Sequence, residues 1–128
     1  MRFITQKIHS LIDYPVAFSL IGMPFVLDLG AANPLARWLS VATGLAAFLL
    51  TVLTNHQTGI IKVIPYAVHL LVDRVVGITF LMAPFVLGFE GIDAIYYWAN
   101  GAVVVVATFI LNAQAENRAV RGQLQAAR

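Results

Sequence analysis

Cysteine is absent from this 128-residue sequence, and charged side chains are scarce. Without thiols, the chain can form no disulfide, no thiolate nucleophile and no cysteine-ligated zinc or iron–sulfur centre. Charged residues make up 11% of the chain and hydrophobic residues 60%, whereas a soluble domain averages about 25% and about 45–50%. So few polar side chains could not cover a soluble surface, and the composition therefore predicts an integral membrane protein. No basic run of the kind that binds nucleic acid is present, so we expect no nucleic-acid partner.

Four apolar stretches follow one another, each close to or longer than the ~20 residues needed to cross the hydrocarbon core. They are Ile8–Leu27, Leu35–Leu53, Ile60–Leu87 and Ile95–Leu111. The breaks between them are short and contain Gly, Asn, Asp and Pro, which end helices and form turns. Short connections make sequential helices antiparallel neighbours. We therefore predict an all-α, four-helix transmembrane bundle that forms a single membrane domain of residues 1–128.

Basic residues are distributed unevenly over a four-span arrangement. The side that holds both termini would carry Arg2, Lys7, Lys62, Arg118, Arg121 and Arg128. The other side has Arg37 as its only basic residue, together with Asp28, Glu90 and Asp93. Since cytoplasmic segments carry the excess of Lys and Arg, both termini are predicted to face the cytoplasm. The more polar tail, residues 112–128, is expected to prolong the last helix beyond the membrane core or along its surface.

The chain matches itself when it is shifted by sixty residues. The matched pairs include His9 with His69, Asp13 with Asp73, Pro24 with Pro84, Phe25 with Phe85 and Trp38 with Trp98. Chance aligns Leu and Val in apolar sequence, but it rarely aligns His, Asp, Pro and Trp at one offset. We infer two tandem repeats, residues 1–60 and 61–120, each with two spans. Because both copies enter the membrane in the same direction, a pseudo-two-fold axis along the membrane normal is predicted to relate them.

Three segments carry a resemblance to a known family: Lys7–Tyr14, Val63–Asp73 and the Pro-Phe-Val-Leu-Gly-Phe sequence at 84–89. They are similar to segments of the SPW-repeat membrane proteins of bacteria, which carry a Ser-Pro-Trp signature in the first helix of each two-helix repeat. Here the signature positions read Met23-Pro24-Phe25 and Ala83-Pro84-Phe85. The resemblance implies a small integral protein of the bacterial inner (plasma) membrane, and it implies no particular reaction.

Two acid–imidazole pairs lie within the apolar stretches. His9 and Asp13 are four residues apart, as are His69 and Asp73, so each pair shares one face of a helix. A carboxylate inside the membrane costs about 2.5–3.5 kcal/mol on insertion scales and rarely faces lipid. If the first and third helices meet across the pseudo-axis, these four side chains converge on one intramembrane polar cluster.

Three hypotheses fit such a cluster. In the first, the acid–imidazole pairs are a structural clamp between the repeats. In the second, His9 and His69 ligate a haem, or they bind zinc, iron or manganese together with the carboxylates. In the third, Asp13 and Asp73 belong to a proton or ion path through the membrane. The duplication does not separate the three, because a repeated clamp and a repeated ligand set have the same sequence pattern.

The first hypothesis is favoured by the short connections and by the lack of phosphate-binding and nucleophile motifs. We therefore expect a non-enzymatic structural or interaction protein with no bound cofactor and no catalytic residues. Its partners would be the lipid bilayer and a second copy of the chain or another membrane protein. Tyr14 and Arg74, which directly follow the two Asp residues, are possible further partners in the cluster.

Aromatic and proline residues gather near the outer ends of the predicted spans. An interfacial belt of aromatic side chains is predicted from Trp38, Tyr96, Tyr97 and Trp98. Pro24 and Pro84 lie close to the ends of the first and third stretches. Because proline cannot donate a backbone hydrogen bond, these two residues are predicted to mark helix termini.

Overall fold

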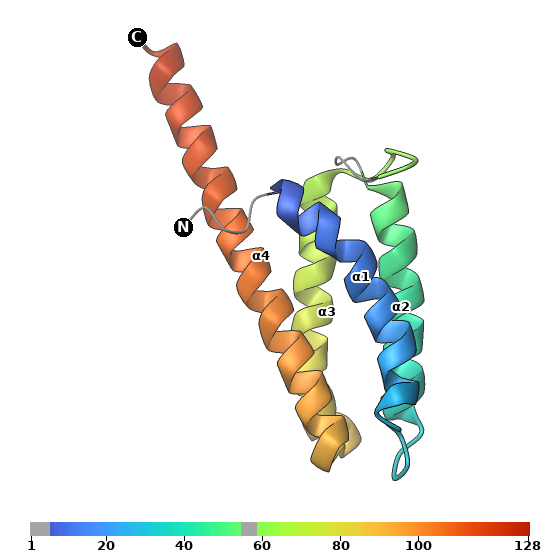
Figure 1. Ribbon diagram of the computed structural model, residues 1–128. Helices are drawn as coiled ribbons and strands as arrows, with labels where there is room; N and C mark the ends of the chain where they lie inside the picture. The colour runs from blue at the N-terminus through green and yellow to red at the C-terminus, as the bar shows by residue number, and fades with distance from the viewer. Residues whose placement is uncertain (1–5, 55–58) are drawn as a thin grey trace.

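The computed structural model describes residues 6–54 and 59–128, without the side chains of 6–7, 9–10, 112–117 and 119. Within that part of the chain, four helices form two antiparallel hairpins (Figure 1). The helices are α1 Gln6–Val26, α2 Leu35–Leu53, α3 Tyr66–Leu87 and α4 Gly91–Ala126. Helices α1 and α2 pack together, as do α3 and α4. The all-α prediction is confirmed.

Apolar length qualifies three of the helices as candidate membrane spans: α2, α3 and the Gly91–Leu111 part of α4. Helix α1 contributes a shorter described apolar stretch, Leu11–Val26. Large apolar side chains are exposed on the outer faces of all four helices, among them Phe18, Leu49, Phe85 and Val103. A water-soluble protein rarely exposes apolar surface so continuously. These surfaces therefore face lipid, and the chain is a membrane protein.

Helix α3 begins at Tyr66, six residues later than the apolar stretch that starts at Ile60. The preceding segment folds back along the end of α2 instead of becoming helical. The amides of Ile60 and Ile61 donate to the Val52 carbonyl oxygen at 2.8 and 2.9 Å, and the Ile64 amide donates to Leu53 at 2.8 Å. These bonds and the extended Pro65 (ψ 142°) exclude a helical start before Tyr66. Tyr66 lies sixty positions after Gln6, the first described residue of α1.

The ends of α1 and α3 have the same backbone structure. The Leu29 amide donates to the Pro24 carbonyl oxygen at 2.8 Å, and the Phe89 amide donates to that of Pro84 at 3.0 Å. Left-handed residues precede these amides: Asp28 with φ 51° and Gly88 with φ 71°. A left-handed residue that closes such bonds is a common helix C-terminus. The two prolines thus lie in the last turns of their helices, as predicted.

Helix α4 begins at Gly91, four residues before the predicted stretch, and continues to Ala126. Its last part extends well beyond the other helices, on the side where α1 starts (Figure 1). The side chains of Arg118, Arg121 and Leu124 are exposed there. The tail therefore prolongs the fourth helix, as its polarity predicted.

Glycines allow the helices of each hairpin to approach closely. A Cβ atom on Gly44 of α2 would lie 2.8 Å from the Ala17 carbonyl oxygen of α1. A Cβ atom on Gly101 of α4 would lie 2.8 Å from the Gly77 carbonyl oxygen and 3.0 Å from the Leu81 amide of α3. Small residues at such positions are typical of packed membrane helices, whose close contacts replace the hydrophobic driving force available in water.

Polar contacts join the two hairpins near the α1–α2 and α3–α4 connections. The Tyr97 hydroxyl donates to the Ala36 carbonyl oxygen at 2.7 Å, and the Tyr96 and Ser40 hydroxyls are 2.7 Å apart. The Gly30 amide donates to Asp93 Oδ1 at 3.1 Å. The assignment of Tyr96 and Tyr97 to an interfacial belt is therefore wrong, because both are buried. Their hydroxyls find partners on the other hairpin, which a lipid-facing tyrosine could not do.

Trp38 and Trp98, in contrast, are exposed near the same end, as a belt requires. Each packs against the phenylalanine that follows the proline of the preceding helix. The ring centroids of Phe25 and Trp38 are 6.0 Å apart, and those of Phe85 and Trp98 are 5.6 Å apart. The two contacts are sixty residues apart in sequence, so the hairpins repeat a packing interaction as well as a sequence pattern.

Candidate functional site

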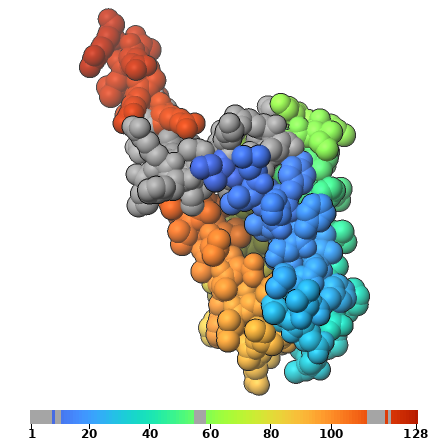
Figure 2. Space-filling view, viewed as in Figure 1, coloured from blue at the N-terminus to red at the C-terminus, as the bar shows by residue number. Residues whose placement is uncertain are grey.

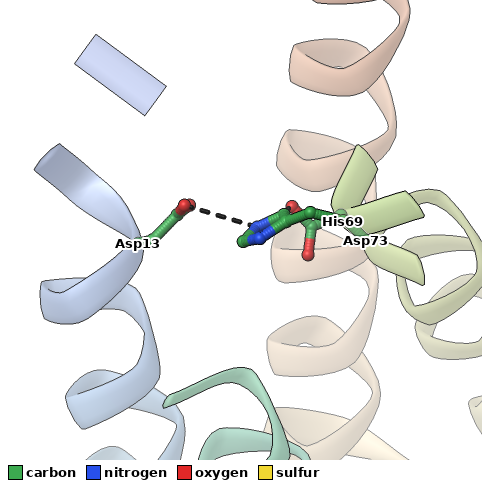
Figure 3. A group of neighbouring side chains, drawn as sticks. All are labelled: Asp13, His69 and Asp73. Carbon is green, nitrogen blue, oxygen red and sulfur yellow. Dashed lines mark ion pairs between the residues drawn. The ribbon is translucent and has the colours of Figure 1, made fainter. Parts of the chain in front are cut away.

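Three of the four predicted cluster residues meet between the hairpins (Figure 3). Asp13 points from α1 toward His69 of α3, and its Oδ2 atom is 3.4 Å from His69 Nε2. Asp73 lies one helical turn after His69, and its Oδ2 atom is 3.1 Å from the same nitrogen. The His69 side chain is 1% exposed, and those of Asp13 and Asp73 are 10% and 19% exposed. The expectation that these side chains converge is therefore met for Asp13, His69 and Asp73.

The other nitrogen of His69 is held by the end of α2. Thr54 Oγ1 lies 2.7 Å from His69 Nδ1, and the same hydroxyl donates to the Leu50 carbonyl oxygen. A threonine hydroxyl has one proton, so with that proton on Leu50 it accepts from histidine. Nδ1 therefore carries a proton, and Nε2 faces the two carboxylates. The Tyr66 ring, stacked on the imidazole with centroids 6.1 Å apart, helps to fix the orientation of the imidazole ring.

A cavity of about 300 Å³ borders the cluster and is lined by all four helices. Apart from the cluster, its walls are aliphatic except for Thr43 and Thr51. Residues sixty positions apart line it in pairs: Ile12 and Val72, Asp13 and Asp73, Val16 and Val76, Thr43 and Val103, and Ala47 and Ala107. The cavity therefore lies between the two hairpins, whose helices α1 (blue) and α4 (orange) form the face shown in Figure 2.

The remaining predicted cluster residues are placed differently. The side chain of His9 lies outside the described residues. The Tyr14 ring packs edge-on against Phe48, with centroids 5.8 Å apart. Arg74 turns toward α4, where it donates to the Thr108 carbonyl oxygen at 3.3 Å and lies 4.5 Å above the Phe109 ring.

The expectation that Arg74 joins the cluster is therefore not met. Adjacent residues on a helix point in different directions, so the side chain after Asp73 cannot share its neighbour's face. Among the described residues, the contacts of Arg74 are to the backbone and an aromatic ring of α4. This arginine thus binds α3 to α4 within one hairpin.

Sequence reasoning missed Thr54 and Tyr66. Thr54 belongs to the predicted break between the second and third stretches, where a hydroxyl has no distinguishing pattern. It reaches His69 because residues 60–65 fold back on α2 and bring the start of α3 beside the end of α2. The one signal available was the position of Tyr66, which precedes His69 by three residues and therefore lies on the same helix face.

The arrangement allows two kinds of chemistry. An imidazole that is protonated on both nitrogens can donate from Nε2 to the two carboxylates and so link α1 to α3 through charge-assisted hydrogen bonds. Alternatively, one nitrogen and two oxygens can ligate a metal ion, since one ligand atom from each residue lies within 4.8 Å of the others. Haem ligation by facing histidines needs a second imidazole, and within the described side chains His69 is the one imidazole in this group.

We compared the chain with protein families, curated proteins and solved structures. No curated protein and no solved structure matches the chain. The family described as the SPW repeat domain matches residues 7–120, which cover both hairpins and the cluster between them. At its signature positions this chain has the Pro24-Phe25 and Pro84-Phe85 pairs whose rings pack on Trp38 and Trp98. The resemblance seen in the sequence is thereby confirmed, and the chain belongs to the SPW repeat family.

Proposed function

We propose that this chain spans the bacterial inner membrane four times and acts as a non-enzymatic structural or interaction protein. In this proposal, Asp13, His69 and Asp73 form an intramembrane clamp between its two hairpins. The observation that carries the proposal is the contact of Asp13 on α1 with His69 on α3, which joins separate hairpins inside apolar surroundings. Each polar side chain needs such a partner, because hydrocarbon does not solvate it.

Four spans and a pseudo-two-fold axis are supported by the lengths and by the cavity. Helix α1 has 21 residues, which at ~1.5 Å per residue suffice for a ~30 Å hydrocarbon core. The paired lining of the cavity is what an axis through its centre would produce. A proton path needs a chain of polar groups, and beyond the cluster the cavity offers only the hydroxyls of Thr43 and Thr51. This lining favours the clamp over a proton path.

The clamp can be tested with spin labels, because the chain has no cysteine of its own. Labels attached through Leu11→Cys on α1 and Val106→Cys on α4 would report the distance between the hairpins; both positions are exposed. We expect Asp13→Asn to broaden the distance distribution measured by pulsed electron paramagnetic resonance, since an amide holds the imidazole less strongly than a carboxylate. Asp28→Asn, which removes an exposed carboxylate near the opposite end, should leave it unchanged. If the distance distribution of Asp13→Asn were the same as that of the unsubstituted chain, the clamp would be contradicted.

The orientation can be tested with single cysteines in the same background. Ala31→Cys lies in the α1–α2 connection and Gln125→Cys in the tail of α4, and both positions are exposed. With cytoplasmic termini, a membrane-impermeant maleimide should label Ala31→Cys in intact spheroplasts. It should label Gln125→Cys only after the membrane is permeabilised. The reverse pattern, or labelling of both positions in intact spheroplasts, would disprove the proposed topology.

A further inference from the structure

We propose that Asp13, His69 and Asp73 bind a divalent transition-metal ion of the zinc type, with one coordination position left toward the apolar cavity. The proposal uses the side chains of the clamp, but it does not depend on their contribution to stability. It rests on three features of the described residues: the distances between the ligand atoms, the orientation of the histidine, and the balance of charge.

The distances fit a shared metal ion. Zinc binds nitrogen and carboxylate oxygen at about 2.0–2.2 Å, so two ligands of a tetrahedral shell are about 3.3–3.6 Å apart. His69 Nε2 is 3.1 Å from Asp73 Oδ2 and 3.4 Å from Asp13 Oδ2. Good hydrogen bonds between a charged nitrogen and a carboxylate are shorter, at about 2.7–2.9 Å. The distance to Asp13 falls in the range of a ligand set and that to Asp73 lies between the two ranges, so small movements would bring these three ligand atoms, already within 4.8 Å of one another, onto one ion.

The orientation of His69 also suits a ligand. Metal-binding histidines donate the proton of their other nitrogen to an oxygen, which fixes the ring and its tautomer. Here Thr54 Oγ1 takes the proton of Nδ1, because its own proton goes to Leu50. The neutral form of this tautomer has its Nε2 lone pair directed at two carboxylates, so either a proton or a metal ion between these atoms makes the arrangement favourable. A buried side chain, 1% exposed, is thus held with a ligand atom aimed into the group.

Charge balance favours a divalent ion. Two ionised carboxylates and an imidazole have a net charge of minus one when the ring is protonated on both nitrogens and minus two when the ring is neutral. A divalent ion and a neutral imidazole would make the group neutral, which apolar surroundings favour.

The donor set points to the chemical class of the ion. Calcium requires six to eight oxygen ligands, and magnesium an octahedron of oxygens. One imidazole and two carboxylates suit zinc, manganese or iron. Three protein ligands leave the fourth position of a tetrahedral ion for water or another small ligand, as in metal sites that are not purely structural. The aliphatic cavity beside the cluster is the space such a ligand would occupy.

The test uses the full chain, purified in detergent and stripped of metal with a chelator. Zinc is added, excess is removed, and the protein-bound metal is measured by elemental analysis. Cobalt(II) serves as a coloured probe, because tetrahedral sites give intense visible absorption. We expect one zinc per chain, and cobalt absorption that is displaced by zinc. His69→Ala should abolish both, whereas Asp93→Asn, a buried acid at the other end of the bundle, should retain both.

Thr54→Val is the second variant, and it keeps all three ligands. Loss of the oxygen that receives the Nδ1 proton should weaken zinc binding by about 10–100-fold. Circular dichroism of each variant verifies that the helices are retained, and Asp73→Asn replaces His69→Ala if the latter does not fold. Absence of stoichiometric metal in the wild type, or binding that survives both His69→Ala and Asp73→Asn, would overturn the proposal. Either result would leave the spin-label test of the clamp intact, so the two ideas fail separately.

Discussion

Replacing His69 with leucine is expected to lower the free energy of unfolding by about 3–5 kcal/mol. The substitution leaves Asp13 and Asp73 near each other in an apolar environment without the imidazole between them. It also removes the donor to Thr54 Oγ1, which is fully buried. Removal of one partner from a buried ionic group costs more than the group itself contributes, because the remaining charges stay desolvated. The measurement is reversible unfolding of the detergent-solubilised chain in the presence of a chelator, so that metal binding does not contribute.

A second substitution separates the loss of charge pairing from the loss of packing. Asp13→Leu in the His69→Leu background removes one of the stranded carboxylates, so the double variant should be more stable than the sum of the single effects predicts. The coupling energy between contacting charged residues is expected to be about 0.5–3 kcal/mol. Arg118→Leu, at an exposed position of the α4 tail, serves as the control and should change stability by less than about 0.5 kcal/mol. Additive effects of Asp13→Leu and His69→Leu would mean that these side chains do not act together.

Gly101→Leu is expected to have the second large effect, a loss of about 3 kcal/mol or of the folded hairpin altogether. The first added carbon would lie 2.8 Å from the Gly77 carbonyl oxygen and 3.0 Å from the Leu81 amide. These are backbone atoms of α3, and they cannot move aside as a flexible side chain can. The helices would have to separate, and the dispersion contacts that hold membrane helices together would be lost along the whole hairpin.

The matched control for this variant is Gly22→Leu in α1. A Cβ atom at Gly22 has no atom within 4 Å, and Gly22 is exposed on a lipid-facing helix. Leucine there should be neutral or slightly stabilising, since glycine is a poor helix former. Unfolding by sodium dodecyl sulfate titration, monitored by circular dichroism, compares the two variants on one scale. If both have the same effect, close contact at Gly101 is not what holds α3 and α4 together.

The sixty-residue repeat shows how far the candidate site can be predicted. Asp13 and Asp73 occupy equivalent places in α1 and α3, as the repeat predicts, but their common depth depends on the start of α3 at Tyr66, because a helix from Ile60 would have placed Asp73 deeper. Their meeting at His69 followed from one physical constraint, the poor solvation of carboxylates in hydrocarbon. The contact of Arg74 with α4 was not predicted, because the sequence pattern alone does not show which neighbouring helix each face of α3 packs against.

Composition and spacing by themselves determined that this chain lies in a membrane, that it is helical and that its hairpins repeat. Those properties depend on local hydropathy, turn residues and self-similarity, which are all present in the linear sequence. Only the tertiary structure decided that α3 starts at Tyr66, that Thr54 orients His69, and that Tyr96 and Tyr97 are buried. Each of these features depends on which segments lie side by side. A hydroxyl group acquires its role only when a backbone or side-chain group that is distant in sequence comes within hydrogen-bonding distance.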